Sequence, residues 1–266
     1  MPIELSETIR VLDQAVFGEI AYEVMSHAFQ IHNDLGRFFD EETYKLELAY
    51  ILGGRAATEV LIRVKHLDFC KTYATDLLVD QGAIFELKAA DHLMDQHRAQ
   101  LLNYLLLTGC RHGKLINFRP ERIEHEFLNT TLTPCDRTAF ALDDSAWDSS
   151  LERAPDIRRL VEDFLRDWGT GLDLQLYADA LTHFCGGKDR VLHDIDIKRD
   201  GRHIGRQKVR LAGTRAAFKF TALRASPEAF ESHARRFLMH TDLLYLHWIN
   251  ITLETVTLKT IIKQTT

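Results

Sequence analysis

Hydrophobic residues recur at helical spacing near the start of the chain, and farther along they alternate with polar residues. Apolar positions three or four apart over 14–35 predict a helix that ends at Gly36. A second helix is expected over 40–52, because two glycines follow it. The period then shortens towards two, which is typical of strands, and predicts strands at 60–64, 73–79 and 83–89. The first part of the chain therefore begins with two helices and three strands.

A third helix and two more strands complete this first half. The helix is expected over 93–107, and the strands over 114–118 and 123–128. Three strands, a crossover helix and a further strand are typical of a mixed sheet that helices cover.

The second half of the chain has the same order of expected elements. Helices are expected near 157–168, 173–185 and 227–243, and strands near 190–198, 203–211, 215–223, 245–251 and 253–262. Each half therefore predicts the order α-α-β-β-β-α-β-β.

The halves also match residue by residue when the chain is shifted by 133 positions, half of its 266 residues. The matching pairs include Gly36 with Gly169, Tyr44 with Tyr177, Phe85 with Phe218, and Ile116-Asn117 with Ile249-Asn250. One register held over this distance indicates a fused pair of related domains. We expect domains at 1–133 and 157–266, joined by a linker at 134–156 that is rich in Pro, Asp and Ser.

The composition is that of a globular protein, with 45% hydrophobic residues and a formal net charge of −6. No apolar run is long enough to span a membrane, and no secretory signal is evident at the N-terminus, so a cytoplasmic location is expected. The four cysteines form no CxxC pair, which argues against a structural zinc site. Because the balance is acidic, a nucleic-acid partner would need a local basic patch.

Three charged residues of the first half are candidates for chemistry. Glu86 and Lys88 are two positions apart on one predicted strand, so they share a face. A hairpin through residues 80–82 would bring Asp76 beside Glu86. Two neighbouring carboxylates repel unless a proton or a metal lies between them, and hard oxygen ligands suit Mg²⁺ or Mn²⁺. A plain ion pair on the strand face is the alternative.

Two helices add further polar candidates. His97, Gln100 and Tyr104 are spaced to lie on one face of the helix after the third strand. Glu41 and Tyr44 form an acid–phenol pair in the second helix. Ordinary amphipathicity and a solvated helix face are the alternatives for these two sets.

Taken together, this ordered series resembles the PD-(D/E)XK nuclease superfamily, and more closely its bacterial GxxExxY family. The residues that carry the resemblance are Asp76, Glu86-Leu87-Lys88, His97 through Tyr104, and Leu115-Ile116-Asn117-Phe118. The similarity covers about residues 15–130. It implies an αβββαβ core in which Asp76 and Glu86 bind Mg²⁺ or Mn²⁺ and complete a catalytic triad with Lys88.

The resemblance also implies roles for the helical residues. Gln100 and Tyr104 match the QxxxY element of RecB-like nucleases, and Glu41 and Tyr44 match the acid and the tyrosine of the GxxExxY motif. Phe38 stands where that motif has glycine. The implied catalytic residues are therefore Asp76, Glu86, Lys88, Gln100, Glu41 and Tyr104.

None of these residues recurs in the second half at the shift of 133. The residues that face them are Val209, Lys219, Thr221, His233, Leu174 and Phe237, in the order of the catalytic residues just given. We therefore expect one active site per chain and a degenerate, non-catalytic second copy. The second half does contain a basic stretch over 198–210, which is either a solvated hairpin or a phosphate-binding surface. Its acidic strand residues, Asp194 and Asp196, are interpreted as a solvated edge.

The expected fold is α/β, with tandem restriction-endonuclease-like αβββαβ cores, each a mixed sheet flanked by helices, related by a pseudo-twofold. The first functional hypothesis is a metal-dependent nuclease with nucleic acid of unknown type as its partner. The second is a non-catalytic, pseudo-dimeric protein that binds nucleic acid or protein. The residues predict no membrane partner and leave the oligomeric state open.

Overall fold

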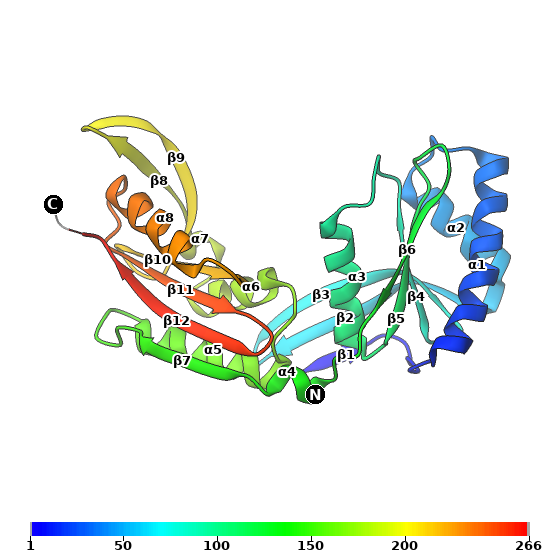
Figure 1. Cartoon of the computed structure of the whole chain (residues 1–266), viewed down its shortest axis with the longest axis horizontal. Helices are drawn as coiled ribbons and strands as arrows, with labels where there is room; N and C mark the ends of the chain where they lie inside the picture. Colours follow the sequence, from blue (N-terminus) through cyan, green and yellow to red (C-terminus); the bar gives the residue numbers. More distant parts are fainter. Residues whose placement is uncertain (1, 265–266) are drawn as a thin grey trace. The chain divides into compact units, whose positions relative to one another are not determined.

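The chain forms two compact units, which divide between Pro134 and Cys135. The structure is a computed structural model that describes residues 2–264 (Figure 1). Each unit is built on a mixed sheet of six strands with helices packed against it. The predicted mixed α/β architecture is therefore confirmed for both halves.

The first unit contains β1 to β6. Its elements are β1 (Ile3–Leu5), α1 (Gln14–Leu35), α2 (Glu41–Leu52), the 3₁₀ turn η1 (Gly53–Arg55), β2 (Ala56–His66), β3 (Phe69–Val79), β4 (Ala83–Lys88), α3 (Asp95–Thr108), β5 (His112–Asn117) and β6 (Glu124–Asn129). The strands follow one another across the sheet in chain order. Only β4 and β5 run parallel to each other, and α3 makes the crossover between them.

The second unit contains β7 to β12. Its elements are α4 (Pro134–Thr138), β7 (Ala141–Ala146), α5 (Ala154–Trp168), α6 (Leu174–Phe184), α7 (Lys188–Val191), β8 (Leu192–Arg199), β9 (Arg202–Leu211), β10 (Ala216–Thr221), α8 (Pro227–Met239), β11 (Tyr245–Ile251) and β12 (Thr255–Ile262). The strand order is β7-β12-β11-β10-β9-β8. The parallel pairs are β10 with β11 and β12 with β7.

The two sheets fit a duplicated core. Five strands of each sheet, β2 to β6 and β8 to β12, have the same order and the same relative directions. A detail of side-chain bonding also recurs, because the hydroxyl of Tyr44 donates to the carbonyl of Gly36 at 2.8 Å and that of Tyr177 donates to Gly169 at 2.5 Å. The pseudo-twofold relation between the units stays a prediction.

The sixth strand of each sheet was not expected from the sequence. β1 pairs with β2 at one edge of the first sheet, whereas β7 pairs with β12 at the opposite edge of the second. The residues 134–156, expected to be a linker, contain α4, β7 and the start of α5 instead. The reason is long-range pairing, since β7 hydrogen-bonds to a strand more than a hundred residues later in the chain.

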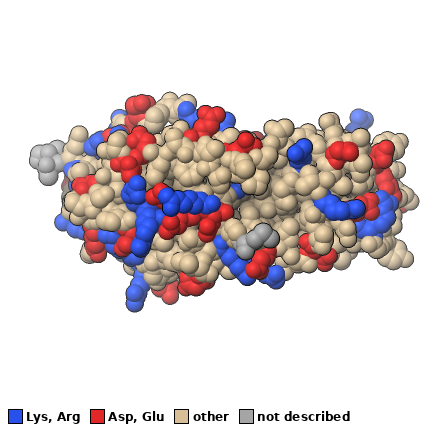
Figure 2. Space-filling model, turned by 90° about the horizontal axis from the view of Figure 1, so that it is seen from below, with Lys and Arg blue, Asp and Glu red and all other residues tan. Residues whose placement is uncertain are grey.

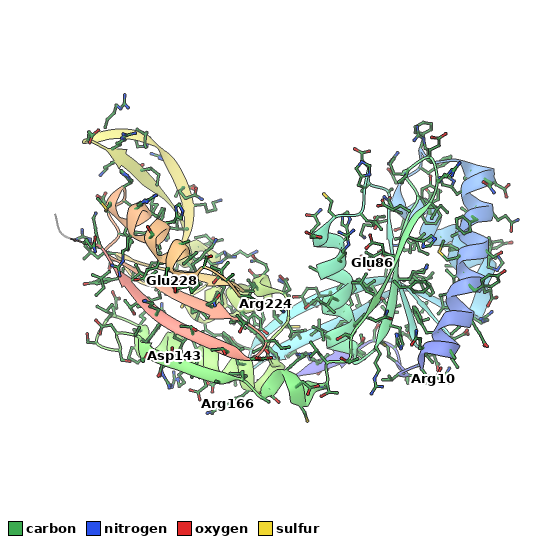
Figure 3. All side chains as sticks on the ribbon, viewed as in Figure 1. Arg10, Glu86, Asp143, Arg166, Arg224 and Glu228 are labelled. Atoms are coloured by element: carbon green, nitrogen blue, oxygen red, sulfur yellow. The ribbon has the colours of Figure 1, made fainter. Side chains whose placement is uncertain are left out.

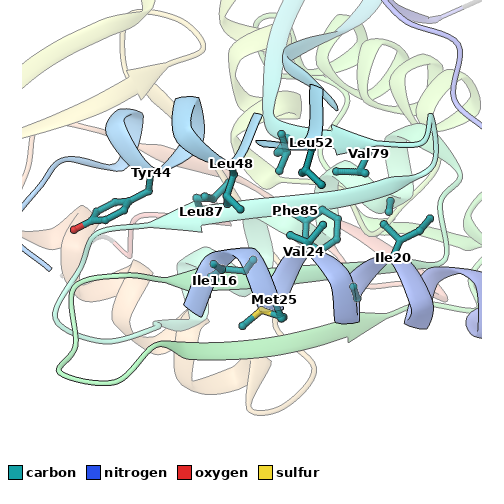
Figure 4. Packing of buried hydrophobic residues seen from close by; sticks show 14 of the residues in the cluster. Ile20, Val24, Met25, Tyr44, Leu48, Leu52, Val79, Phe85, Leu87 and Ile116 are labelled. Atoms are coloured by element: carbon teal, nitrogen blue, oxygen red, sulfur yellow. The ribbon is translucent and has the colours of Figure 1, made fainter. Parts of the chain in front are cut away.

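Helices cover both faces of the first sheet, and each face has its own hydrophobic cluster. Helices α1 and α2 pack on one face, where Figure 4 shows buried side chains from both helices and from β3, β4 and β5: Ile20, Val24, Tyr44, Leu48, Val79, Phe85, Leu87 and Ile116. Helix α3 covers the other face through Leu101 and Leu105, which meet Ile84 and Leu115. Burying each such side chain contributes roughly 1.5–3 kcal/mol, and this packing on both faces buries every residue of β4.

Candidate active site

A tight hairpin sets the register of the strands that carry the candidate residues. Asp80 and Gln81, between β3 and β4, have φ values of +49° and +59°, which is the pattern of a type I′ turn. The guanidinium of Arg55 binds the Asp80 carboxylate at 2.6 Å and so supports the turn. Within this register Leu77 pairs with Phe85, and the next residues outward are Asp76 and Glu86.

At Asp76 a side-chain hydrogen bond replaces the backbone pairing between β3 and β4. Its Oδ2 accepts a hydrogen bond of 2.8 Å from the backbone N–H of Leu87, in the neighbouring strand. The side chain is buried, and the bond fixes its position against β4. Asp76 and Glu86 thus come together as the sequence predicts.

Glu86 and Lys88 lie on the face of β4 that α3 covers (Figure 3 labels Glu86). Glu86 is only 1% exposed. The Nζ of Lys88 lies 2.9 Å from Oε1 of Glu86 and 3.5 Å from Oδ2 of Asp76, and it donates to the carbonyl of Leu87 at 2.6 Å. One ammonium group therefore bridges the two carboxylates of the predicted triad.

Helix α3 contributes Gln100 and Tyr104, one turn apart. The Nε2 of Gln100 donates to Oε1 of Glu86 at 2.5 Å and to the hydroxyl of Tyr104 at 3.0 Å. Gln100 is therefore in direct contact with the carboxylate, and Tyr104 contacts Gln100. The structure brings both residues into the cluster.

Helix α2 begins beside the cluster with Glu41. Its Oε1 lies 3.5 Å from Nζ of Lys88, and its side chain is 38% exposed. Tyr44, three residues later, points elsewhere: it bonds Gly36 and stacks on Phe118 with the ring centres 4.3 Å apart. Glu41 thus forms the open side of the cluster, whereas Tyr44 fixes the connection between α1 and α2.

Burial and charge act in opposite directions on the ionisable groups of the site. Burial, together with the nearby Asp76 carboxylate, raises the pKa of Glu86 to about 8. Burial also raises the pKa of Glu41. Burial alone would lower the pKa of Lys88, but the surrounding carboxylates outweigh it and raise that pKa. Three carboxylates around one ammonium leave an excess of negative charge.

The donor set fits a hard divalent cation. Oε1 of Glu86 accepts from Lys88 and Gln100, while its Oε2 is buried without a hydrogen-bond partner among the described residues. No group of three or more His, Cys, Asp and Glu side chains within residues 2–264 is arranged to hold a metal. Asp76 and Glu86, which share the ammonium group of Lys88, are two carboxylates, and Mg²⁺ is usually bound by one or two carboxylates plus water.

Two residues of the recognised series have supporting roles that sequence reasoning missed. His97 accepts the backbone N–H of Met94 at Nδ1 and so caps the start of α3. Asn117, at the end of β5, donates to the carbonyl of Ala90 at 2.7 Å and accepts its N–H at 3.1 Å. The signal for Asn117 was its match to Asn250, which clamps Leu223 in the same way in the second unit. A polar residue that both halves share is a signal from which a scaffold role could have been inferred.

The second unit, as described up to residue 264, has no counterpart of this cluster. Lys219, at the position of Glu86, is exposed, and Thr221, at the position of Lys88, accepts the indole N–H of Trp248 at 2.7 Å. Val209 and His233 stand at the positions of Asp76 and Gln100. These residues offer no pair of carboxylates.

The basic stretch over 198–210 forms the β8–β9 hairpin, and most of its charges are paired. Lys198 binds Asp242 at 2.8 Å, and Arg206 binds Asp196 at 3.1 Å. Asp196 is thus engaged with a neighbouring strand, as expected for a surface edge. Lys and Arg also lie among Asp and Glu on the face shown in Figure 2. No helix of the part that the structure describes has the length and apolar character to cross a membrane.

Comparison with known proteins finds a family model that matches part of the first unit. A sequence model of the PD-(D/E)XK nuclease superfamily matches residues 18–129, a span that contains all six candidate catalytic residues. No curated protein matches the chain. A solved structure titled "Crystal structure of SSO0001" is similar at 21% identity and a TM-score of 0.28, over 46% of this chain and 61% of that chain.

Proposed function

We propose that the chain is a metal-dependent nuclease that hydrolyses phosphodiester bonds at a single active site in the first unit. The observation that carries the proposal is the Lys88 ammonium group, 2.9 Å from Glu86 and 3.5 Å from Asp76 within a span that matches the nuclease superfamily. The second unit, which lacks these residues, is a non-catalytic copy in this proposal. The grouping within the superfamily that we favour is the GxxExxY family.

Asp76 and Glu86 would hold the metal, Mg²⁺ or Mn²⁺, with the free Oε2 of Glu86 as one ligand. When bound, the cation supplies Lewis acidity and a water of lowered pKa. Its positive charge would also favour the ionised form of Glu86, whose pKa burial and the nearby Asp76 carboxylate raise.

Lys88 and Gln100 prepare the site for a phosphodiester. The Lys88 ammonium group is held by carboxylates on two strands, so it can orient a water molecule or stabilise negative charge on a phosphoryl oxygen. Gln100 occupies Oε1 of Glu86 and leaves Oε2 available. Glu41 keeps Lys88 charged from the open side, and Tyr104 orients the Gln100 amide.

The direct test is Mn²⁺ binding by titration calorimetry, because it needs no choice of substrate. We expect the wild-type chain to bind Mn²⁺ and Glu86→Gln to lose binding, while the exposed Glu121→Gln on the same unit binds normally. Equal Mn²⁺ binding by wild type and Glu86→Gln would contradict the proposed metal site.

Activity is tested in the same set of variants. With Mn²⁺ present, we expect cleavage of DNA or RNA, single- or double-stranded, to fall by about 10² or more in Lys88→Met, the scale on which lost charge stabilisation acts. The Glu121→Gln protein should cleave like wild type. Retained cleavage in Lys88→Met would remove that residue from the proposed mechanism.

A competing function is favoured by one specific observation. Lys88 already contacts three carboxylates, so the cluster is partly neutralised without any cation. In that case the protein would be a non-catalytic binding protein with specificity for nucleic acid or protein. Absence of Mn²⁺ binding in wild type, with and without nucleic acid present, would favour this alternative.

A further inference from the structure

The second unit has an open cavity of about 350 Å³ between its sheet and α8. Strands β9, β10 and β11 form its floor, and residues of α8 form one wall. A volume of this size is within the range of small-molecule sites, which is roughly 300–1,000 Å³.

The cavity occupies the place that corresponds to the active site of the first unit. Four of its lining residues stand at the shift of 133 from site residues: Val209 for Asp76, Lys219 for Glu86, His233 for Gln100 and Phe237 for Tyr104. Both carboxylates have therefore been replaced, one by an apolar side chain and the other by an ammonium group. The charge at this location is reversed between the two units.

Two polar side chains line the cavity on the face that α8 covers, and its lining set contains no acidic residue. Lys219 contributes a positive charge, and His233 contributes a ring nitrogen. Lys219 has no ion-pair partner within residues 2–264, in contrast to the paired residues of the β8–β9 hairpin. Lys208 and Arg210 alternate with Val209 along β9 and point to the other face of the sheet, where Nη2 of Arg210 lies 3.5 Å from Asp179 on α6. Lys219 and His233 together suit an anion such as a phosphate.

An aromatic and aliphatic wall lines the same cavity as Lys219 and His233. Phe230 and Phe237 on α8 are half-buried, and Ala217 and Leu246 on the sheet add apolar surface. Phe230 stacks on Trp248 with ring centres 4.5 Å apart, which fixes its orientation. Aromatic faces of this kind stack on nucleic-acid bases without requiring a particular sequence.

We infer that this cavity binds one nucleotide, with its phosphate held by Lys219 and His233 and its base against Phe237. A purely inorganic anion would leave the aromatic wall unused, and an uncharged aromatic ligand would leave Lys219 unused. This inference goes beyond the proposed nuclease activity, because it uses no residue of the first unit. The nucleotide can be free or part of a strand, since both present the same phosphate and base.

The test is calorimetric titration of the full chain with adenosine 5′-monophosphate in EDTA, which keeps the first unit free of metal. We expect binding that weakens about tenfold or more in Lys219→Ala, because a charge-assisted hydrogen bond is lost. Phe237→Ala should weaken binding through loss of stacking, by about fivefold or more. Lys188→Ala, an exposed lysine outside the cavity, should bind like wild type.

Further arms separate the possible results. Inorganic phosphate should bind at least about tenfold more weakly than the nucleotide, since it cannot stack. If a single-stranded oligonucleotide binds more tightly than the mononucleotide, the natural ligand is a nucleotide within a strand. If the mononucleotide binds more tightly, the ligand is the free nucleotide. Because Phe237→Ala can disturb packing, its thermal unfolding is compared with wild type, and the exposed His233→Ala provides a second variant that should weaken binding.

Three outcomes would overturn the inference: no binding of either nucleotide form, equal binding of phosphate and nucleotide, or binding unaffected by Lys219→Ala and His233→Ala. Loss of nucleotide binding in Glu86→Gln would also overturn it, because the ligand would then occupy the first unit. Failure of Mn²⁺ binding, by contrast, would contradict only the proposed nuclease. The two proposals are therefore tested separately.

Discussion

At the scale of single residues, buried charges in this protein differ in what compensates them. In the candidate site, the buried Glu86 and Lys88 compensate each other as an ion pair. Lys114, on the adjacent strand β5, is only 1% exposed and instead lies over the ring of Phe127, with Nζ 3.4 Å from the ring centre. Burial lowers the pKa of Lys114 to about 8. A buried ammonium group compensated mainly by an aromatic ring is expected to destabilise the fold.

Lys114→Met should therefore stabilise the protein at pH 7. The lowered pKa indicates that the buried charge costs about 3 kcal/mol of stability, which the substitution removes. The substitution also removes the cation–π contact, which stabilises wild type by about 1 kcal/mol. We expect the free energy of unfolding to rise by about 1–3 kcal/mol in urea titrations. Lys71→Met, which removes a half-buried lysine over Tyr73, is the matched control and should change stability little.

The pH dependence of Lys114→Met follows from the same shift. The folded protein releases this proton near pH 8, whereas the unfolded chain keeps it to about 10.5. The unfolded state thus binds more protons than the folded state between these pH values, so wild-type stability rises with pH there. The difference in free energy of unfolding between Lys114→Met and wild type therefore becomes smaller. A Lys114→Met protein no more stable than wild type at pH 7 would contradict the argument.

His247 predicts a loss of stability in acid. It is fully buried on β11, its Nε2 has no hydrogen-bond partner among the described residues, and burial lowers its pKa to about 4. The unfolded chain binds the proton near pH 6.5, so stability falls as the pH falls from 6.5 to 4. From pH 7 to pH 5, the free energy of unfolding measured by urea titration should fall by on the order of 2 kcal/mol less in His247→Gln than in wild type. His193→Gln, which changes an exposed histidine, serves as control. If the stability of His247→Gln fell with acid as steeply as that of wild type, His247 would not be the cause.

At the scale of elements, the parallel strand pair ends in the same way in both units. Asn117 on β5 clamps Ala90, just beyond β4, and Asn250 on β11 clamps Leu223, just beyond β10. Each clamp satisfies one backbone N–H and one carbonyl that the sheet leaves unpaired. In the first unit the clamp follows Lys88 by only two residues and so supports the candidate site.

Asn117→Ala and Asn250→Ala form a matched pair of variants. Each should lower the free energy of unfolding by about 1–3 kcal/mol, because the half-buried backbone N–H and carbonyl of Ala90 or Leu223 lose their partner. Only Asn117→Ala should weaken Mn²⁺ binding, by about tenfold, the effect of residues that support metal ligands. Calorimetry and urea titration on both proteins check this. Weakened Mn²⁺ binding in Asn250→Ala would show that the effect is not local.

At the scale of the whole molecule, two units with related sheets carry different side chains at corresponding positions. The first has an acidic cluster around Lys88, and the second has a basic cavity around Lys219. The sheet framework that the two units share needs its apolar positions and clamps for folding, whereas its polar positions are free to change. The two units are therefore expected to bind ligands of opposite charge.

This asymmetry predicts one Mn²⁺ site per chain. Calorimetry should give a stoichiometry near one, because Val209 and Lys219 offer no carboxylate where the first unit has Asp76 and Glu86. Lys219→Ala should leave both the stoichiometry and the affinity unchanged. Two equivalent sites per chain, or a site that survives Glu86→Gln, would contradict the asymmetry.

The sequence by itself determined the local elements, the match between the two halves and the core of the candidate site. Helical and strand periods depend on neighbouring residues, and the Glu86–Lys88 spacing places both on one face of a strand whatever surrounds it. The hairpin register needed only the short turn after β3. These features are local, so their signal lies within a few residues.

Only the tertiary structure decided which groups surround those residues. The edge strands β1 and β7 are defined by partners far away in the chain, such as Val64 for Ile3 and Thr255 for Ala141. The unpaired Oε2 of Glu86 and the burial of Lys114 likewise depend on packing from several elements. The cavity beside α8 exists because side chains from three strands and a helix leave space between them. Such long-range juxtapositions have no local pattern, because the contacts that create them form only when the sheet is assembled.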